Sequence, residues 1–510
     1  MHINKIVSCN SIINPTEATD KIMRGIDFLA NCTKQTLGPW GRNFLIEKGL
    51  KITNDGISIA KEIQLKDEIE DLGLRVARNA AVKTNDEVGD GTTTSLVLVQ
   101  AILKEIVKLL PGKQLAGRKS VIEIRKQIAK ERKEVVEKLK EFATPIKTKE
   151  ELIDVARVAV EDRELAELIG STQWELGPEG TLIVEPTNDL NDSVEKINGI
   201  RFDNGFGTSL MMNNKEKQRL EVKNVQVIMT NYTFHDLNPV KSLLDQMVKN
   251  NMKNIVIVAR AFTDEAIQIC MKNHEVGVKI YPINAPYVNQ GEVMRDLQAV
   301  LGGTYFNQEE RTLEEMQVSD LGFAEEVWSY RFSAIFTGVK DERADERIKN
   351  RVIDLRKSLK GEESVFMKKE IETRISQLTN GFSLIKIGAL SDEERKYKLD
   401  KAEDGVNTVK SALEEGTVKG AGLAFKEISD GMTDDYILKR PLLSINQQIF
   451  SNAGEIFEIE PWVKDSVKVV RVAFENACEI AANLATACGA VAAERPKSRY
   501  VEEVREEELE

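Results

Sequence analysis

Cysteine, histidine and long apolar runs are scarce in this chain, and each scarcity argues against a class of protein. The 510 residues include five cysteines and three histidines. The cysteines occur singly, with no Cys-x-x-Cys pair and no histidine at ligand spacing, which argues against both a zinc site and a disulfide framework. This usage is typical of a protein in a reducing cytosol. The cysteines are Cys9, Cys32, Cys270, Cys478 and Cys488.

The chain also lacks a membrane segment and an excess of positive charge. No run approaches the roughly 18 apolar residues of a membrane helix. The formal net charge is −12, and because proteins bind nucleic-acid phosphates through Lys and Arg, no nucleic-acid partner is expected. The amino end has neither a secretion-signal nor a transit-peptide pattern, so we expect no targeting segment and a cytoplasmic location. The histidines (His2, His235, His274) have no evident catalytic partner.

The residues that are present are those of a globular protein of more than one domain. Hydrophobic residues make up 41% and charged residues 30% of the chain. A chain of 510 residues exceeds what one compact core usually holds, which predicts two or three domains.

Helical spacing and turn residues predict the elements of the first 110 residues. Apolar residues recur at helical spacing from 17 to 35, and Gly38-Pro39 ends that helix. Two short strands follow, with a tight turn at 54–56. A helix over 66–88 leads to the sequence GDGTTT, residues 89–94, which opens a strongly apolar helix.

The rest of the chain changes character after Pro145, where a new domain is expected. Between about 199 and 381, strand-like runs alternate with helix-like runs, the pattern of an α/β layer. The charge-dense helices at 341–378 are interpreted as a solvated face without chemistry.

The last part of the chain is predicted to be largely helical. Ser391 and Glu394 form a capping pattern that begins a helix running to Gly416, with Asp404 well inside it. A final helix is expected over 467–493, followed by a disordered acidic tail at 501–510.

The loop at 89–94 carries the most informative local signal. Glycines allow backbone amides to face a phosphate, and the amino end of the following helix adds partial positive charge. Asp90 fits as an oxygen ligand to Mg²⁺ that bridges phosphates. A capped helix behind a tight turn explains the same residues equally well.

Other polar turns are weaker signals when taken alone. The turns at 36–43 and 54–56 are consistent with ordinary loops, and Asp404 with a solvated surface carboxylate. Residues 112–120 resemble a P-loop, but an arginine interrupts the motif and a helix precedes it, so we interpret them as a basic loop. Without a P-loop, a metabolic kinase is not supported.

Taken in order, four segments resemble the GroEL-type (group I) chaperonin family. They are TLGPWGRN, ITNDGISIAKEI, NDEVGDGTTTSLVLVQAIL and LDKAEDGVNTVKSALEEGTVKGAGLAF. The similarity extends weakly along nearly the whole chain and is poorest between about 150 and 380. It implies a multidomain α+β protein with a mostly helical equatorial domain, a small intermediate domain and an α/β apical domain. The implied ranges are 1–142 and 415–510 (equatorial), 143–198 and 382–414 (intermediate) and 199–381 (apical).

The resemblance also implies an ATPase site, with ATP and Mg²⁺ as cofactors and K⁺ as a candidate ion. Asp404 would arrive by hinge closure to position the attacking water, Asp55 would assist, and Asp90 would bind the metal. The implied nucleotide contacts are Thr36, Leu37, Gly38, Pro39, Asn54, Asp90, Gly91, Thr92, Thr93, Thr94, Ala421 and Asp465.

Hinges and client contacts are implied in the same way. Gly199 and Gly381 match the hinge glycines of the family. Six apolar residues fall where the family exposes side chains to unfolded clients: Phe206, Leu210, Met211, Leu244, Ile267 and Met271. The alternative for Leu244 and Ile267 is burial under their own amphipathic helices.

The chain departs from the family pattern at several places. Trp40 and Asn54 stand where the family has lysines, and Ala421 replaces a glycine, which we expect to crowd the base pocket slightly. The segment at 456–465 is much shorter than the family's hairpin with an adenine-contacting Asn-Ala-Ala, and the carboxyl-terminal Gly-Gly-Met repeats are absent. These departures put adenine contacts and ring-to-ring contacts in doubt, and we expect a single ring or weakly joined rings. Such divergence fits a chaperonin carried by a bacterial virus.

The sequence therefore predicts an ATP-dependent chaperonin that encloses non-native protein in a homo-oligomeric ring, heptameric by resemblance. A GroES-like co-chaperonin is a further candidate partner. The alternative is a chaperonin-like holdase or assembly scaffold with little ATP turnover. Retention of Asp55, Asp90 and Asp404 favours the ATPase, because a holdase needs no metal ligand and no hydrolytic carboxylate.

Overall fold

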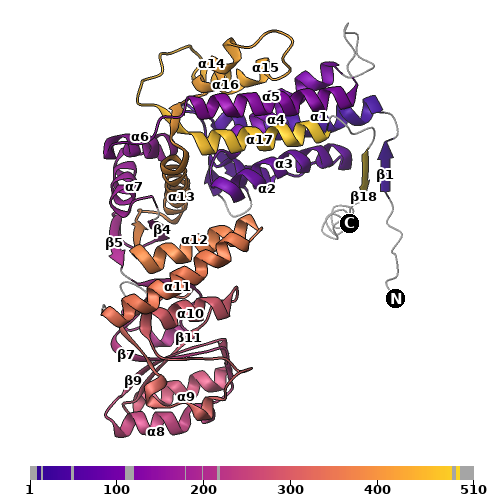
Figure 1. Cartoon of the computed structure of the whole chain (residues 1–510). Helices are drawn as coiled ribbons and strands as arrows, with labels where there is room; N and C mark the ends of the chain where they lie inside the picture. The colour runs from indigo at the N-terminus through magenta and orange to yellow at the C-terminus, as the bar shows by residue number, and fades with distance from the viewer. Residues whose placement is uncertain are drawn as a thin grey trace. The chain divides into compact units, whose positions relative to one another are not determined.

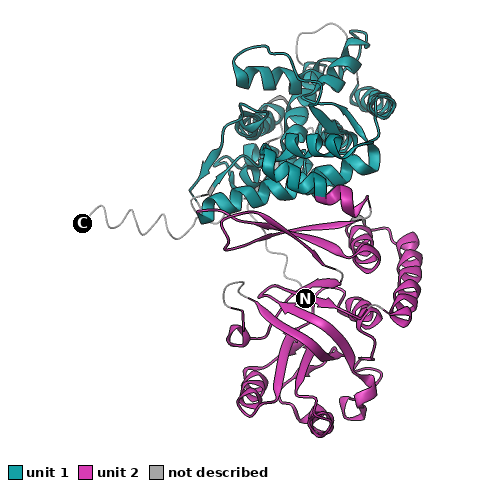
Figure 2. Ribbon diagram, turned by 90° about the vertical axis from the view of Figure 1, so that its left-hand side faces the viewer, with its two compact units in different colours: residues 1–171, 391–510 teal, residues 172–390 magenta. Residues whose placement is uncertain are grey.

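Two compact units make up the chain. A computed structural model describes residues 9–12, 15–47, 51–109, 120–178, 180–197, 199–214, 219–339, 341–484 and 490–493. Unit 1 combines residues 1–171 with 391–510, and unit 2 is residues 172–390 (Figure 2). The division into three domains at the ranges given above stays a prediction. The rejected P-loop (112–119) and the acidic tail (501–510) lie outside the described residues.

Unit 1 is built on long helices with buried apolar faces. Helices α1, α3, α4 and α17 pack against one another (Figure 1). Ile26 and Leu29 of α1 and Leu98 and Ile102 of α4 are fully buried, as the apolar spacing predicts. The helices of unit 1 are α1 (Pro15–Thr33), α2 (Gly56–Glu62), α3 (Glu68–Val88), α4 (Thr92–Leu109), α5 (Val121–Glu141), α6 (Lys149–Val160), α13 (Asp392–Glu415), α14 (Leu423–Asp430), α15 (Lys439–Leu442), α16 (Ser444–Ala453) and α17 (Val467–Leu484). Helix α7 (Arg163–Leu176) runs into unit 2.

Short strand pairs complete unit 1. β1 (Cys9–Ile12) pairs antiparallel with β18 (Ala490–Ala493), β2 (Phe44–Ile46) with β3 (Lys51–Thr53), and β16 (Thr417–Lys419) with β17 (Lys464–Ser466). The expected helix over 467–493 is wrong at its end, because α17 stops at Leu484 and 490–493 is a strand. Backbone pairing with β1, nearly the whole chain away, overrides the helix propensity of this alanine-rich segment.

Unit 2 contains the predicted α/β layer. Its large sheet has the order β11-β9-β7-β13-β14-β6, with β12 also paired to β7. β7, β9 and β11 are parallel, whereas β13 is antiparallel to both β7 and β14. The strands of this sheet are β6 (Ile200–Asp203), β7 (Leu220–Thr230), β9 (Asn254–Ala259), β11 (Lys279–Asn284), β12 (Tyr305–Phe306), β13 (Gly322–Ser329) and β14 (Ser333–Thr337). A separate parallel pair consists of β8 (Thr233–Phe234) and β10 (Ala261–Phe262).

A smaller sheet and helices α8 to α12 accompany the large sheet in the described part of unit 2. The small sheet has the order β4-β15-β5, made of β4 (Thr181–Pro186), β15 (Phe382–Ile387) and β5 (Ser193–Ile197). The helices are α8 (Lys241–Lys249), α9 (Asp264–Glu275), α10 (Gln290–Leu301), α11 (Glu342–Gly361) and α12 (Val365–Asn380). Across the described residues, no helix is both long and apolar enough to span a bilayer.

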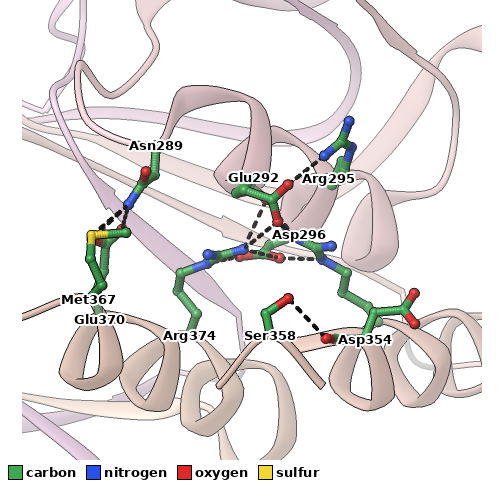
Figure 3. A network of polar contacts seen from close by, with 10 residues as sticks. Asn289, Glu292, Arg295, Asp296, Asp354, Ser358, Met367, Glu370 and Arg374 are labelled. Carbon is green, nitrogen blue, oxygen red and sulfur yellow. Dashed lines mark hydrogen bonds and ion pairs between the residues drawn. The ribbon is translucent and has the colours of Figure 1, made fainter. Parts of the chain in front are cut away.

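The sequence led us to expect that α11 and α12 form only a solvated face. In the structure, both helices also carry arginines that point inward. Asp296 of α10 is fully buried, and its carboxylate contacts Arg351 Nε of α11 at 2.6 Å and Arg374 Nε of α12 at 2.5 Å (Figure 3). Glu292 of α10 contacts Arg351 Nη2 at 2.7 Å. Charge density along the two helices concealed these inward-facing arginines, because their acceptor lies on a different helix.

Candidate functional site

The first part of the candidate site is the loop between α3 and α4. Gly89 ends α3 in a left-handed conformation, with φ of 71°, and donates its N–H to the Asn85 carbonyl at 2.8 Å. Gly91 has φ of 78°, and a Cβ there would lie 2.8 Å from Val469 Cγ1. The loop therefore needs both glycines to turn directly into the amino end of α4.

The amino end of α4 faces a cavity. Thr92, Thr93 and Thr94 all line it. The first N–H groups of a helix have no partner within the helix, and the helix dipole gives this end partial positive charge. An anion such as phosphate is the ligand that such an end favours. A simple helix cap, the alternative that the sequence left open, would not need a cavity in front of the helix.

Two carboxylates beside this loop are held by hydrogen bonds. Asp55 caps α2 and accepts from the N–H groups of Ile57 and Ser58 at 3.2 and 3.0 Å. Asp90 accepts a hydrogen bond from Thr408 Oγ1 of α13. Both carboxylates line the cavity, and these hydrogen bonds fix their positions in its wall.

Two further carboxylates in the cavity have raised pKa values. Burial is the main cause for Asp404, whose pKa lies well above the usual value, and the charges of Asp90 and Asp55 raise it further. Lys401 opposes this shift. Burial, followed by the charge of Asp90, raises the pKa of Asp465 to about 7. Perturbed acids gathered in one cavity mark a candidate functional site.

The cavity wall also contains basic side chains that were not predicted from the sequence. Lys401 pairs with Glu161 at 3.0 Å, and Arg157 of α6 lies with its Cζ 4.1 Å from the centroid of the Trp462 ring. Lys401 is three residues before Asp404, so helical periodicity could have placed both on one face of α13. No local signal identifies Arg157, because its partner lies far away in the sequence.

Two departures from the family pattern lie in the cavity wall as well. Asn54 donates from Nδ2 to Tyr397 Oη at 3.4 Å. Ala421 has φ of 54°, a left-handed conformation that costs an L-residue about 1–2 kcal/mol. Its carbonyl accepts from Asn446 Nδ2 at 3.1 Å. The alanine thus also affects backbone conformation, and the expected crowding of the pocket stays a prediction.

Part of the wall is apolar. Gly38, with φ of 82°, lies against Ile449, whose Cγ2 would be 3.2 Å from a Cβ at that glycine. The ring centroids of Trp40 and Phe457 are 4.5 Å apart. The apolar lining residues are Leu37, Pro39, Trp40, Val158, Ala159, Ala421, Ile445, Ile449, Phe457, Ile459, Trp462, Val463, Val469 and Val470.

The cavity suits a nucleotide with one bound cation. Its volume is about 750 Å³, within the usual range for small-molecule pockets. In the described part of the chain, no group of three or more His, Cys, Asp or Glu side chains is arranged as a metal site. Mg²⁺ commonly binds through one or two carboxylates, substrate phosphates and water, which the arrangement around Asp90 permits.

The structure brings together nearly all residues that the resemblance implied for the nucleotide. Gly91 lies between two lining residues, and all the others, with Asp55 and Asp404, line this one cavity. Asp404 already lies in the wall, on a helix that packs against α6 and α17. The roles of these residues stay predictions.

The six implied client contacts lie in unit 2 and differ in exposure. Leu210 is 72% exposed. Three are half-buried against neighbouring residues: Leu244, Ile267 and Met271. The sequence left two alternatives open for Leu244 and Ile267, exposure to clients and burial under their own helices. Their half-buried side chains are intermediate between these two.

Phe206 and Met211 are buried, so the expectation that their side chains are exposed is wrong. They are 9% and 7% exposed and belong to the core of unit 2. Phe206 forms a backbone bridge with Ile283 of β11, which holds this segment against the large sheet. The apolar character that suggested a binding surface here serves packing instead.

The two implied hinge glycines are both required by local geometry. Gly381 ends α12 with φ of 69°, and a Cβ at Gly199 would lie 2.3 Å from the Phe336 carbonyl oxygen. The boundaries between the compact units fall at 171/172 and 390/391 instead. Hinge motion at Gly199 and Gly381 stays a prediction.

Comparisons with known proteins agree with this arrangement. The TCP-1/cpn60 chaperonin family matches residues 29–435. Among solved structures, the chaperonin gp146 from the bacteriophage EL 2 (Pseudomonas aeruginosa), in the presence of ATP-BeFx, is similar with a TM-score of 0.65 and 19% identity. That match covers 95% of this chain and 99% of the other. A second crystal form of gp146 gives a TM-score of 0.59 and 18% identity, covering 96% and 100%. The predicted chaperonin architecture of mixed helices and sheets is confirmed.

Proposed function

This chain belongs to the TCP-1/cpn60 chaperonin family, and from that premise we propose that it is an Mg²⁺-dependent ATPase that folds non-native protein inside a homo-oligomeric ring. The single observation that carries the proposal is the cavity of unit 1. It gathers the glycine loop, the amino end of α4 and the carboxylates of Asp55, Asp90 and Asp404, which are far apart in the sequence. That ATP-BeFx was present with gp146 supports a nucleotide as the ligand.

Each group has a task in phosphoryl transfer to water. The N–H groups and hydroxyls of Thr92, Thr93 and Thr94 bind phosphate oxygens. Asp90 would hold Mg²⁺, which neutralises phosphate charge when bound. Asp404 orients the attacking water and accepts its proton, a role suited to a carboxylate whose pKa burial raises above its usual value. Asp55 lies close enough to Asp404 to raise its pKa and helps to orient the same water.

Removal of the metal is the direct test of this proposal. Excess EDTA should abolish phosphate release from ATP, and added Mg²⁺ should restore it, because phosphates and carboxylates in one cavity repel without a cation. Phosphate release is measured at steady state while light scattering reports the particle mass in the same buffer. A ring-sized particle that releases no phosphate with Mg²⁺ would support the holdase alternative instead.

An exposed apolar pair in unit 1 supports assembly with further copies of the chain. Leu45 and Ile52 lie opposite each other on β2 and β3 and are 70% and 48% exposed. A two-stranded hairpin is marginally stable alone, and apolar side chains on it favour contact with a partner. We place this hairpin in the subunit interface of the ring.

Leu45→Glu should prevent or weaken assembly, because it puts a charge into that interface. Light scattering at micromolar concentration should show a shift from ring-sized particles toward single subunits. Leu190→Glu is the matched control, since Leu190 is 64% exposed and lies in unit 2. Intact particles of the Leu45 variant would exclude the hairpin from the interface.

A further inference from the structure

The irregular segment at 455–463, between α16 and β17, forms part of the cavity wall. Phe457 and Ile459 are half-buried, whereas Ile456, Glu458 and Glu460 are exposed. Such alternation is expected of an extended chain, whose successive side chains point to opposite sides. Phe457 and Ile459 therefore form the more buried, inner face of the segment. Both line the cavity, as do the exposed residues Glu458 and Glu460.

The inner face of this segment meets Trp40. The ring planes of Trp40 and Phe457 are inclined at 58°, with centroids 4.5 Å apart. Phe450 of α16 supports Phe457 from another side, with centroids 5.1 Å apart and the rings nearly perpendicular. Trp40 keeps 46% of its surface exposed, so its ring is available to a ligand. Aromatic pairs of this geometry fix one another in place.

This contact joins two departures from the GroEL pattern that are unrelated in the sequence. Trp40 replaces a lysine, and the segment that carries Phe457 replaces a longer hairpin with an Asn-Ala-Ala sequence. The aromatic pair lines the same cavity as Leu37 and Pro39. At the shortened segment 455–463, the rings of Trp40 and Phe457 therefore provide an apolar surface in the cavity wall.

Side-chain amides that could read the edge of a base are nearly absent from the cavity. Among the described residues that line it, Asn54 alone carries a carboxamide, and its amide donates to Tyr397 at 3.4 Å. A site that hydrogen-bonds its substrate rejects analogues strongly, whereas an apolar site discriminates weakly between rings of similar shape. Aromatic stacking tolerates different bases because each base presents a π-face.

We propose that Trp40 and Phe457 hold the nucleobase by stacking and apolar contact, so that the site accepts purine nucleoside triphosphates with little regard to their exocyclic groups. The inference rests on the proposed nucleotide-binding function and adds its base selectivity. Trp40 supplies the exposed ring, while Phe457 and Ile459 supply the adjoining wall.

Equilibrium binding tests this inference without turnover. Isothermal titration with the Mg²⁺ complexes of ATPγS and GTPγS should give dissociation constants that differ by less than about a hundredfold for the unchanged chain. Trp40→Ala should weaken both ligands by about 5- to 150-fold, and Trp40→Phe should recover most of the loss. Trp174→Ala is the matched control, because Trp174 is 39% exposed and does not line the cavity.

The outcomes separate this inference from the proposed function. If the unchanged chain binds neither analogue, the nucleotide-binding function is wrong and the inference is overturned with it. If ATPγS binds but GTPγS is weaker by more than about a hundredfold, the site reads base edges and only the inference is overturned. The same holds if Trp40→Ala binds both ligands as tightly as the Trp174→Ala control.

Discussion

Asp404→Ala should lower the rate of ATP hydrolysis by about 10²- to 10⁴-fold while nucleotide affinity changes little. In the proposed mechanism the carboxylate at this position orients water and accepts a proton, and alanine can do neither. Phosphate and base contacts come from other residues, so binding should persist. Steady-state phosphate release and titration with Mg²⁺-ATPγS measure the two quantities separately.

Glu403→Ala is the matched control for this substitution. Glu403 is the adjacent residue of α13, and its side chain is exposed. The Glu403→Ala variant should hydrolyse ATP at nearly the rate of the unchanged chain. If the Asp404→Ala and Glu403→Ala variants hydrolyse ATP at equal rates, Asp404 has no part in the mechanism. If Asp404→Ala no longer binds nucleotide, Asp404 has a structural role instead.

Asp296→Asn should reduce the free energy of unfolding of unit 2 by about 3–5 kcal/mol. The asparagine keeps the volume but removes the buried one of the two negative charges, Asp296 and Glu292, that pair with Arg351 and Arg374. The side chains of these arginines are only 13% and 10% exposed, so water cannot replace the lost partner. Urea unfolding followed by tryptophan fluorescence measures the effect, since Trp328 lies in β13 of the same unit.

Asp354→Asn separates the effect of burial from that of charge. Asp354, labelled in Figure 3, lies on the same helix as Arg351 and is 63% exposed, and its carboxylate contacts Lys357 at 3.1 Å. An exposed ion pair contributes at most about 1 kcal/mol, so this variant should unfold almost like the unchanged chain. Similar decreases in the free energy of unfolding of the two variants would mean that the burial of Asp296 does not increase the cost of removing its charge.

Much of the fold could be predicted from local patterns. The stripe that includes Ile26 and Leu29 predicted α1, and the continuous apolar run after residue 94 predicted the buried helix α4. Ser391 accepts from the Glu394 N–H at 3.2 Å, as the capping pattern predicted. These features depend on residues a few positions apart, which is why the sequence contains them.

What could not be predicted depends on partners that are distant in the sequence. The strand at 490–493 forms because β1 pairs with it, and nothing within that segment indicates a strand. Burial of Phe206 depends on β11, and the contact of Trp40 with Phe457 crosses most of the chain. The loop, Asp55 and Asp404 became one candidate site by resemblance, because no local rule places them together.

The discontinuity of unit 1 constrains how the protein can be made. A ribosome releases residues 172–390 as one continuous segment, so unit 2 can fold during synthesis, as domains generally do. Helix α17, which packs against α3 and α4, is translated near the end, after α13 with Asp404. The apolar faces of α3 and α4 that α17 covers therefore remain exposed until α17 has been synthesised. The cavity of unit 1 is therefore complete only after α13, β17 and α17, which contribute part of its wall, have been synthesised.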